Sequence, residues 1–260
     1  MSDYENILFE HDGPIARITL NRPNAANGID QALADELVRA AQYCSDDPAV
    51  KVVVLTGAGR FFSAGGDVRA MAASADTGEF IERLADTLHR AVSALARMDA
   101  LLIVGVNGTA AGAGMSLAVA GDLVVAAESA SFTMAYTKVG LSPDGGASYY
   151  LPRLIGVRKT QELMLTNRTL SAAEALDWGL LHRVVRDVEL ADAVETLAQE
   201  FATGPKASNA NVKKLLLVSS QHNLEEQLNL EASFITRCSS SPDGQEGIAA
   251  FVGKRAPKFA

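Results

Sequence analysis

Cysteine and tryptophan are scarce in this chain of 260 residues, which has two of the first and one of the second. Cys44 and Cys238 form neither a metal-ligand spacing nor a disulfide framework, so the sequence excludes a zinc module and a disulfide scaffold. A reduced, cytoplasmic setting is therefore expected. No group of His, Asp and Glu residues has ligand spacing either, and we expect a site that needs no metal.

Basic residues are outnumbered, because 23 Lys and Arg stand against 31 Asp and Glu and give a net charge of −8. Nucleic acid is a poor partner for such a chain, since binding to phosphates needs clustered Lys and Arg. Long apolar runs are missing too: the run Leu101–Val106 is too short to span a membrane. Met1–Glu10 has three acidic residues and no apolar segment, so no signal peptide is expected.

What the chain does have is an alternation of strands, small-residue turns and helices. Ile7–His11 and Ile15–Leu20 predict a hairpin, and β-branched runs at Val50–Thr56 and Leu101–Val106 are typical of strands buried on both faces. Further elements are expected as helices over Asp30–Tyr43, Asp67–Ala73, Glu79–Met98 and Met115–Ala120, and as a strand over Leu123–Ala127. This order predicts right-handed crossovers and a largely parallel sheet in an α/β fold.

Beyond Pro152 the pattern becomes mainly helical. Helices are predicted over Val157–Leu165, Ala172–Trp178, Leu190–Thr203, Ala207–Ser219, Leu224–Arg237 and Gly244–Gly253. Because Gly204-Pro205 interrupts this series, we expect an α/β core of residues 1–203 and a helical C-terminal region of residues 204–260. The apolar residues of that region exceed what one sheet needs as cover, which predicts self-association.

Two turns of very small residues, Phe62–Asp67 and Gly108–Gly114, carry the strongest chemical signal. Each leads from a strand into a helix, whose first N–H groups are unpaired and whose dipole is positive at that end. Two such turns on neighbouring parallel strands can direct two N–H groups at one oxygen, which is the geometry of an oxyanion hole. Close packing of a helix on a sheet explains the same glycines in either turn alone.

Taken together, the motifs resemble those of the crotonase superfamily, the enoyl-CoA hydratase/isomerase family. The matching stretches are Leu20-Asn21-Arg22-Pro23, Phe62–Asp67, Asn107–Gly114, Gly121-Asp122, Gly140–Pro143, Leu151-Pro152-Arg153, Glu174-Ala175 and Trp178-Gly179-Leu180. The resemblance implies a crotonase-like spiral of ββα units and a helical C-terminal trimerisation region. It also implies acyl-CoA thioester substrates, no cofactor apart from the coenzyme A of the substrate, and a homotrimer or a dimer of trimers.

The resemblance maps the two oxyanion donors onto the backbone N–H groups of Gly66 and Ala113, where the family usually has Gly in place of Ala113. The residues that it assigns to the acyl group or to coenzyme A are Arg22, Ala64, Gly65, Asp67, Gly112, Tyr136, Phe251 and Lys254. Phe251 and Lys254 match positions that contact the adenine and the 3′-phosphate, often from a neighbouring subunit. Without the resemblance, these two residues indicate only a surface helix.

Two glutamates that are typical of the hydratases are missing, and Ser116 and Tyr136 stand at their positions. Hydroxyl groups of ordinary acidity are poor substitutes for carboxylates that activate water near pH 7. One carboxylate does fall in the right region, that of Asp144 in a Pro-Asp-Gly-Gly context. This context resembles the isomerases of phenylacetyl-CoA breakdown and the 4-chlorobenzoyl-CoA dehalogenases, although Pro-Asp-Gly is also a common turn sequence.

His89 bears on the choice between these activities. It aligns with the dehalogenase base that activates water. The alternative interpretation is that His89 has no catalytic role and lies at the edge of an apolar helix face. The aromatic wall around the benzoyl ring of the dehalogenases is replaced by Ile81, Leu88 and Tyr136, which fits an enoyl or alicyclic chain better.

We therefore predict an acyl-CoA double-bond isomerase that uses Asp144 as acid and base. Three alternatives stay open. They are an enoyl-CoA hydratase that uses Asp144 and Tyr136, an aryl-CoA dehalogenase with Asp144 as nucleophile and His89 as base, and a non-catalytic acyl-CoA-binding relative.

Overall fold

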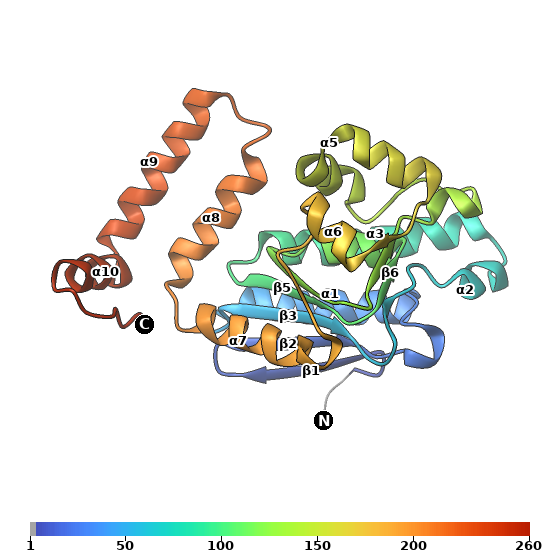
Figure 1. Ribbon diagram of the computed structural model, residues 1–260, viewed down its shortest axis with the longest axis horizontal. Helices are drawn as coiled ribbons and strands as arrows, with labels where there is room; N and C mark the ends of the chain where they lie inside the picture. Colours follow the sequence, from blue (N-terminus) through green and yellow to red (C-terminus); the bar gives the residue numbers. More distant parts are fainter. Residues whose placement is uncertain (1–3) are drawn as a thin grey trace.

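Two β-sheets of unequal size organise the fold (Figure 1). The computed structural model describes residues 4–260. The larger sheet has six strands in the order β1-β2-β3-β5-β7-β10, and the smaller has four in the order β4-β6-β8-β9. The strands of the large sheet are β1 (Ile7–Asp12), β2 (Ile15–Leu20), β3 (Val52–Gly57), β5 (Leu101–Val106), β7 (Leu123–Ala127) and β10 (Arg183–Val185). Those of the small sheet are β4 (Phe61–Ser63), β6 (Thr109–Ala111), β8 (Ser131–Thr133) and β9 (Leu170–Ser171).

Strand direction follows from the connections. The predicted hairpin is confirmed, since β1 and β2 pair antiparallel with Ile7 opposite Leu20. All other pairs of the large sheet are parallel, as are β4 with β6 and β6 with β8. A long strand, a short strand and then a helix repeat along the chain, which confirms the spiral of ββα units. The expectation of a plain turn over Asn107–Gly114 is wrong at Thr109–Ala111, because a three-residue strand is too short to show a period in sequence.

Helices follow most of the predicted ranges. The α-helices are α1 (Gln31–Asp46), α2 (Val68–Ala73), α3 (Thr77–Arg97), α4 (Ala113–Val119), α5 (Ala147–Thr166), α6 (Ala172–Trp178), α7 (Leu190–Ala202), α8 (Lys206–Val218), α9 (Leu224–Ser240) and α10 (Pro242–Val252). Short 3₁₀ helices are η1 (Pro23–Ala25), η2 (Tyr136–Val139) and η3 (Asp187–Glu189). Asp30 and Asp76 begin α1 and α3, because their carboxylates accept the N–H groups of Leu33 and Glu79. The first half of α5 lies outside the predicted range, and Gly156, with a φ of 75°, breaks this helix where the predicted half begins.

The central strands of the large sheet are buried on both faces, whereas the edge strands β1 and β10 are partly exposed. Val53 and Leu55 belong to the main core, which also contains the apolar faces of α1 and α3. Val52 and Val54 point the other way and pack with Leu190, Val194 and Ala198 of α7. Because helices pack on both faces of β3 and β5, these strands are uninterrupted apolar runs in the sequence.

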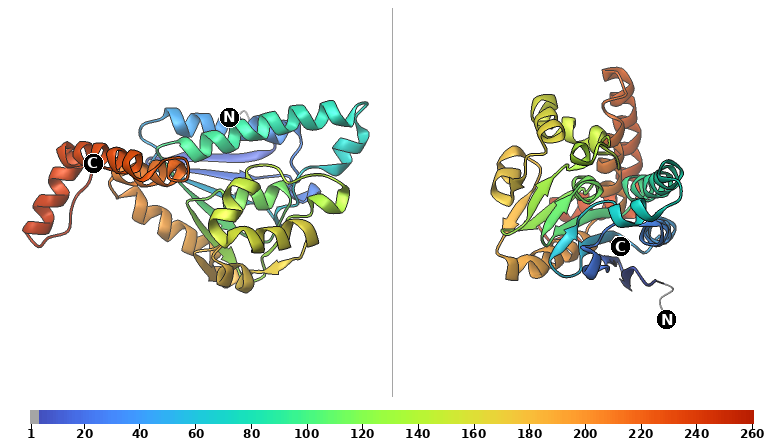
Figure 2. Two further views of the ribbon diagram at one scale, coloured as in Figure 1. Left: turned by 90° about the horizontal axis from the view of Figure 1, so that it is seen from above. Right: turned by 90° about the vertical axis from the view of Figure 1, so that its right-hand side faces the viewer.

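The last three helices, α8 to α10, extend from one end of the core as an arm (Figures 1 and 2). Lys213 of α8 ties this arm to the sheet, since its side chain is buried and its ammonium lies 2.9 Å from the Asp122 carboxylate. The same ammonium donates to the carbonyl oxygens of Leu95 and Ala100, at 2.7 and 3.1 Å. Burial lowers the pKa of Lys213, and the Asp122 charge opposes that shift. The boundary expected between residues 203 and 204 stays a prediction.

Within residues 4–260, no helix is both long and apolar enough to cross a membrane.

Candidate active site

A cavity of about 290 Å³ lies where the two small-residue turns meet. Ala64 and Gly66 of the first turn line it, together with Gly112 and Ala113 of the second. The rest of its wall is mostly aliphatic, and its apolar residues include Ile29, Met71, Ile81, Leu84, Leu88, Val139 and Leu141. The structure thus brings the two segments singled out in the sequence to one apolar space.

Backbone hydrogen bonds to Ile29 fix the first turn, and the second turn packs closely against it. Ile29 donates its N–H to the carbonyl of Gly65 at 2.7 Å, and Asp67 donates to the carbonyl of Ile29 at 2.9 Å, so Gly66 is held between two bonded neighbours. Gly65 has a φ of 92°, and a Cβ there would lie 2.7 Å from the Ala111 carbonyl oxygen. Only glycine lets the turns approach this closely.

The N–H groups of Gly66 and Ala113 are the two predicted oxyanion donors. Both residues line the cavity, and Ala113 is the first residue of α4, where a helix N–H has no partner within the helix. Among residues 4–260, neither N–H donates to a protein acceptor. The turns therefore offer two donors to a ligand.

Asp144 lies on the wall of the cavity, in the loop between η2 and α5. Its side chain is 33% exposed, and Oδ1 is 2.5 Å from Nε2 of His89 on α3. His89 itself is 52% exposed and does not line the cavity that Leu84 and Leu88 line. The structure therefore places the two titratable residues singled out in the sequence in direct contact.

Ser116 and Tyr136 hold the backbone of Asp144. The buried Ser116 hydroxyl donates to the Asp144 carbonyl oxygen at 2.7 Å, and the Tyr136 hydroxyl donates to the same oxygen at 3.2 Å. Burial raises the pKa of Tyr136, so its phenol is a neutral donor at physiological pH. The sequence pointed to Ser116 and Tyr136 as replacements of two glutamates and to Tyr136 as a substrate contact, but no motif signals that both hydroxyls hold the Asp144 carbonyl.

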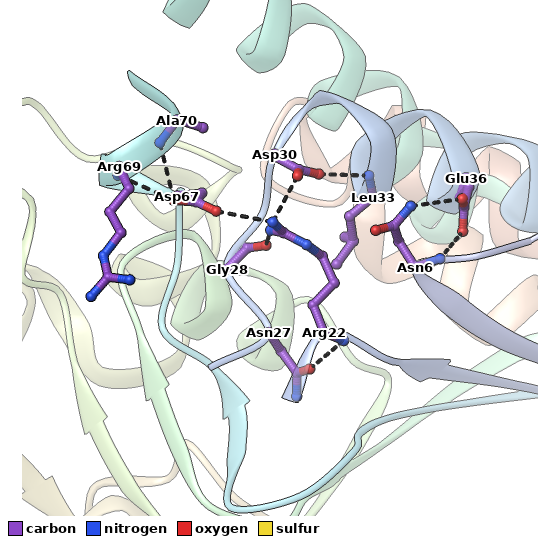
Figure 3. Close-up of polar contacts among 10 residues, drawn as sticks. All are labelled: Asn6, Arg22, Asn27, Gly28, Asp30, Leu33, Glu36, Asp67, Arg69 and Ala70. Atoms are coloured by element: carbon purple, nitrogen blue, oxygen red, sulfur yellow. Dashed lines mark hydrogen bonds and ion pairs between the residues drawn. The ribbon is translucent and has the colours of Figure 1, made fainter. Parts of the chain in front are cut away.

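A second polar cluster lies behind the first turn (Figure 3). The guanidinium of Arg22 lies 2.8 Å from the Asp30 carboxylate and 3.1 Å from that of Asp67, and it donates to the carbonyl of Gly28. Asp67 also accepts the N–H groups of the first turn of α2. Burial opposes its ionisation, but these backbone N–H groups and Arg22 together keep the pKa of Asp67 below its ordinary value.

Neither Arg22 nor Asp67 lines the cavity, so their expected contacts with substrate stay predictions. Phe251 and Lys254 do not reach the cavity of their own chain either. Phe251 belongs to α10 and Lys254 follows this helix, which lies at the opposite side of the molecule from α2 (Figure 1), and Phe251 is 86% exposed. In the described part of the chain, no three His, Cys, Asp or Glu residues are grouped in a way that would hold a metal ion.

Comparison with known proteins identifies the family of this chain. The sequence profile of the family described as enoyl-CoA hydratase/isomerase matches residues 10–260. The chain belongs to the enoyl-CoA hydratase/isomerase family. The two-sheet spiral is also the fold of solved members of this family.

Individual relatives cover the whole length. The chain is 37% identical to 1,2-epoxyphenylacetyl-CoA isomerase of Escherichia coli (strain K12), over 98% of both chains. It is 30% identical to trans-2-decenoyl-[acyl-carrier-protein] isomerase of Streptococcus mutans, over 99% of this chain and 98% of the other. The crystal structure of an enoyl-CoA hydratase from Polaromonas sp. JS666 superposes with a TM-score of 0.92 at 32% identity, covering 98% of this chain and 99% of that one.

These matches confirm the crotonase fold and an enzyme of acyl-CoA chemistry. These relatives include two isomerases and one hydratase, so their names do not decide which of the two reactions this chain catalyses.

Proposed function

We propose that this protein is an enoyl-CoA double-bond isomerase in which Asp144 moves the proton. The observation that carries this proposal is that Asp144 is the one carboxylate among the residues that line the cavity, within the described part of the chain. Hydration needs one group to activate water and another to protonate carbon, whereas a double-bond shift needs one group that removes a proton and returns it.

The proposed step begins with the thioester oxygen between the N–H groups of Gly66 and Ala113. The carboxylate of Asp144 removes a proton from the allylic carbon, and the C–H electron pair enters a dienolate whose charge rests on the thioester oxygen. Two backbone donors stabilise that charge as it develops. Asp144 then returns the same proton to another carbon of the dienolate, so the carboxylate is regenerated and no water is consumed.

The cavity wall supports an aliphatic or alicyclic acyl group. Ile81, Leu88 and Tyr136, which replace the aromatic wall of the dehalogenases, all line the cavity. Tyr136 is the one aromatic residue among the lining residues of the described chain, and its hydroxyl is already bonded to the Asp144 backbone. A flat benzoyl ring would find little stacking surface here.

Aryl-CoA dehalogenation is the second candidate, because the contact of His89 with Asp144 at 2.5 Å fits a base beside a nucleophile. In that reaction the carboxylate forms an aryl ester, which water hydrolyses with the help of the base. Mass spectrometry of the protein after mixing with a halobenzoyl-CoA separates the candidates, since only the dehalogenase carries the added aryl mass.

The deciding experiment is incubation with a panel of acyl-CoA thioesters in water enriched in heavy oxygen, with identification of the products. We expect a shifted double bond without incorporated label. A product that contains the label would refute isomerisation and indicate hydration or hydrolysis.

We also propose that the arm mediates assembly into a homotrimer or a dimer of trimers. Large apolar side chains on it are exposed in the single chain, including Val212, Leu216, Leu228, Ile235 and Phe251. Their burial between subunits would be favourable and would let Phe251 and Lys254 reach a neighbouring cavity. Light scattering at micromolar concentration is expected to give the mass of three or six chains, and a monomer would contradict the proposal.

A further inference from the structure

The contact of His89 with Asp144 separates two cavities. Asp144 lines the first, which would hold the acyl group. His89 lines a second cavity of about 380 Å³ between α3, the start of α5 and the end of α8. Ser93, Arg97 and Gln221 give this second cavity a polar part, and Asp144 does not line it. The imidazole therefore bridges a carboxylate on one side and a more polar space on the other.

We infer that His89 exchanges the proton of Asp144 with solvent through the second cavity. This inference rests on the proposed isomerase function and adds to it a route by which the Asp144 proton exchanges with water. An acyl chain in the first cavity would cover the carboxylate with apolar groups and close its direct way to water. His89 keeps an open route, because its side chain is 52% exposed while its Nε2 lies 2.5 Å from Asp144 Oδ1.

The exchange conserves protons. After Asp144 has taken the allylic proton, its O–H bond breaks as the proton passes to Nε2 of His89. The exposed ring then gives this proton to water as the N–H bond breaks, and Nε2 takes another proton or deuteron from water and delivers it to the Asp144 carboxylate. The dienolate waits in the first cavity meanwhile, and its protonation then carries a solvent hydrogen into the product.

The test is isomerisation of a 3-enoyl-CoA thioester in deuterium oxide, with the deuterium content of product and recovered substrate measured by mass spectrometry. The variant is His89→Gln, whose amide keeps a donor near Asp144 but cannot relay a proton. Arg90→Gln is the matched control, since Arg90 is the next residue on α3 and lines neither cavity. Ser93→Leu fills the second cavity one helical turn from His89 without touching the carboxylate.

We expect the wild-type product to contain solvent deuterium and the His89→Gln product to retain the hydrogen of the substrate. Deuterium per turnover should fall roughly tenfold or more, as is usual when a proton-transfer group is removed. Ser93→Leu should lower the deuterium content with little loss of turnover, and Arg90→Gln should match the wild type.

Equal deuterium per turnover in the wild type and in His89→Gln would overturn the inference and leave the isomerase intact. The inference would also fail, with the isomerase function intact, if the wild-type product contained only the hydrogen of the substrate. A wild type that neither isomerises nor exchanges hydrogen would instead refute the proposed function.

Discussion

Asp144 lines the cavity and Asp67 does not, and the two carboxylates are held in opposite ways. The Asp67 side chain is 15% exposed and accepts from Arg22 and from two N–H groups of α2. The Asp144 side chain has one partner within residues 4–260, His89, while its backbone carbonyl is held by Ser116 and Tyr136. For Asp67 the network fixes the carboxylate itself. For Asp144 it fixes the main chain, and one carboxylate oxygen stays available to the cavity.

This difference separates an acid that supports the fold from an acid that can do chemistry. A carboxylate that already accepts three hydrogen bonds, as that of Asp67 does, cannot take a proton from substrate without disturbing this network. A carboxylate on a fixed main chain meets the requirement that a base be positioned before it reacts. The predictions that follow test the contrast between Asp67 and Asp144.

The largest effect is expected for Asp144→Asn, because the amide keeps the shape of the side chain but cannot accept a proton. We expect isomerase turnover to fall at least about 1000-fold and the dissociation constant for acyl-CoA to change by less than about tenfold. Asp67→Asn is the matched control and should keep turnover within about tenfold. Steady-state kinetics and calorimetric binding measure both. Wild-type kcat in Asp144→Asn would make Asp144 a mere turn residue.

The second prediction concerns the oxyanion donors. Gly66→Pro deletes one N–H and should lower kcat on the order of 100- to 1000-fold. Gly66→Ala keeps the donor and is the control. Its Cβ would lie 2.5 Å from the end of the Met71 side chain, which is flexible enough to move.

We expect the alanine variant to be clearly more active than the proline variant, with both shown to be folded by circular dichroism. Near-normal turnover in a folded proline variant would exclude the Gly66 N–H as a ligand of the thioester oxygen.

Smaller effects are expected when the support of the Asp144 carbonyl is weakened. Ser116→Ala and Tyr136→Phe each remove one of its two hydroxyl donors, worth about 1 kcal/mol, so kcat should fall roughly fivefold to tenfold. KM should change less, because these hydroxyls position the base and do not bind the acyl chain. Ser116→Thr should restore much of the rate. A loss confined to KM would contradict a positioning role.

The smallest expected effect is on stability in acid. Because the pKa of Asp67 is lowered in the folded state, its contribution is present above the unfolded value of about 3.9. That contribution is lost as the pH falls toward the lower folded-state value. Asp67→Asn should therefore lose less stability than the wild type between about pH 5 and pH 3, measured by thermal unfolding.

Glu36 also has a lowered pKa. Its contribution to the pH dependence of stability is the same in the wild type and in Asp67→Asn, so it cancels when the two are compared. Burial opposes its ionisation, and hydrogen bonds from Asn6 and from the backbone of Glu5, Asn6 and Ile7 outweigh that effect. Equal pH dependence in the wild type and in Asp67→Asn would show that the Arg22 cluster does not depend on the Asp67 charge.

Sequence periodicity predicted the long elements because each repeats its pattern several times, as in α3 and β5. It failed for strands of two or three residues such as β6 and β9, which are too short to repeat anything. The two turns were predictable from their small residues, whereas the assignment of the donors to Gly66 and Ala113 came from the family resemblance.

The contact of His89 with Asp144 was not predictable from pattern, because it joins a helix and a loop that are 55 positions apart. The rotation of α3 about its axis decides on which side of Leu88 the imidazole lies, and only packing sets that rotation.

Lys213 has a consequence for attempts to shorten the protein. If the chain were cut before α8, the Asp122 carboxylate and the carbonyl oxygens of Leu95 and Ala100 would all lose the ammonium that now binds them. The truncated core would lose an ion pair and two hydrogen bonds to a buried ammonium, each of which contributes to stability. A core cut before α8 is therefore expected to unfold at a lower temperature than the whole chain.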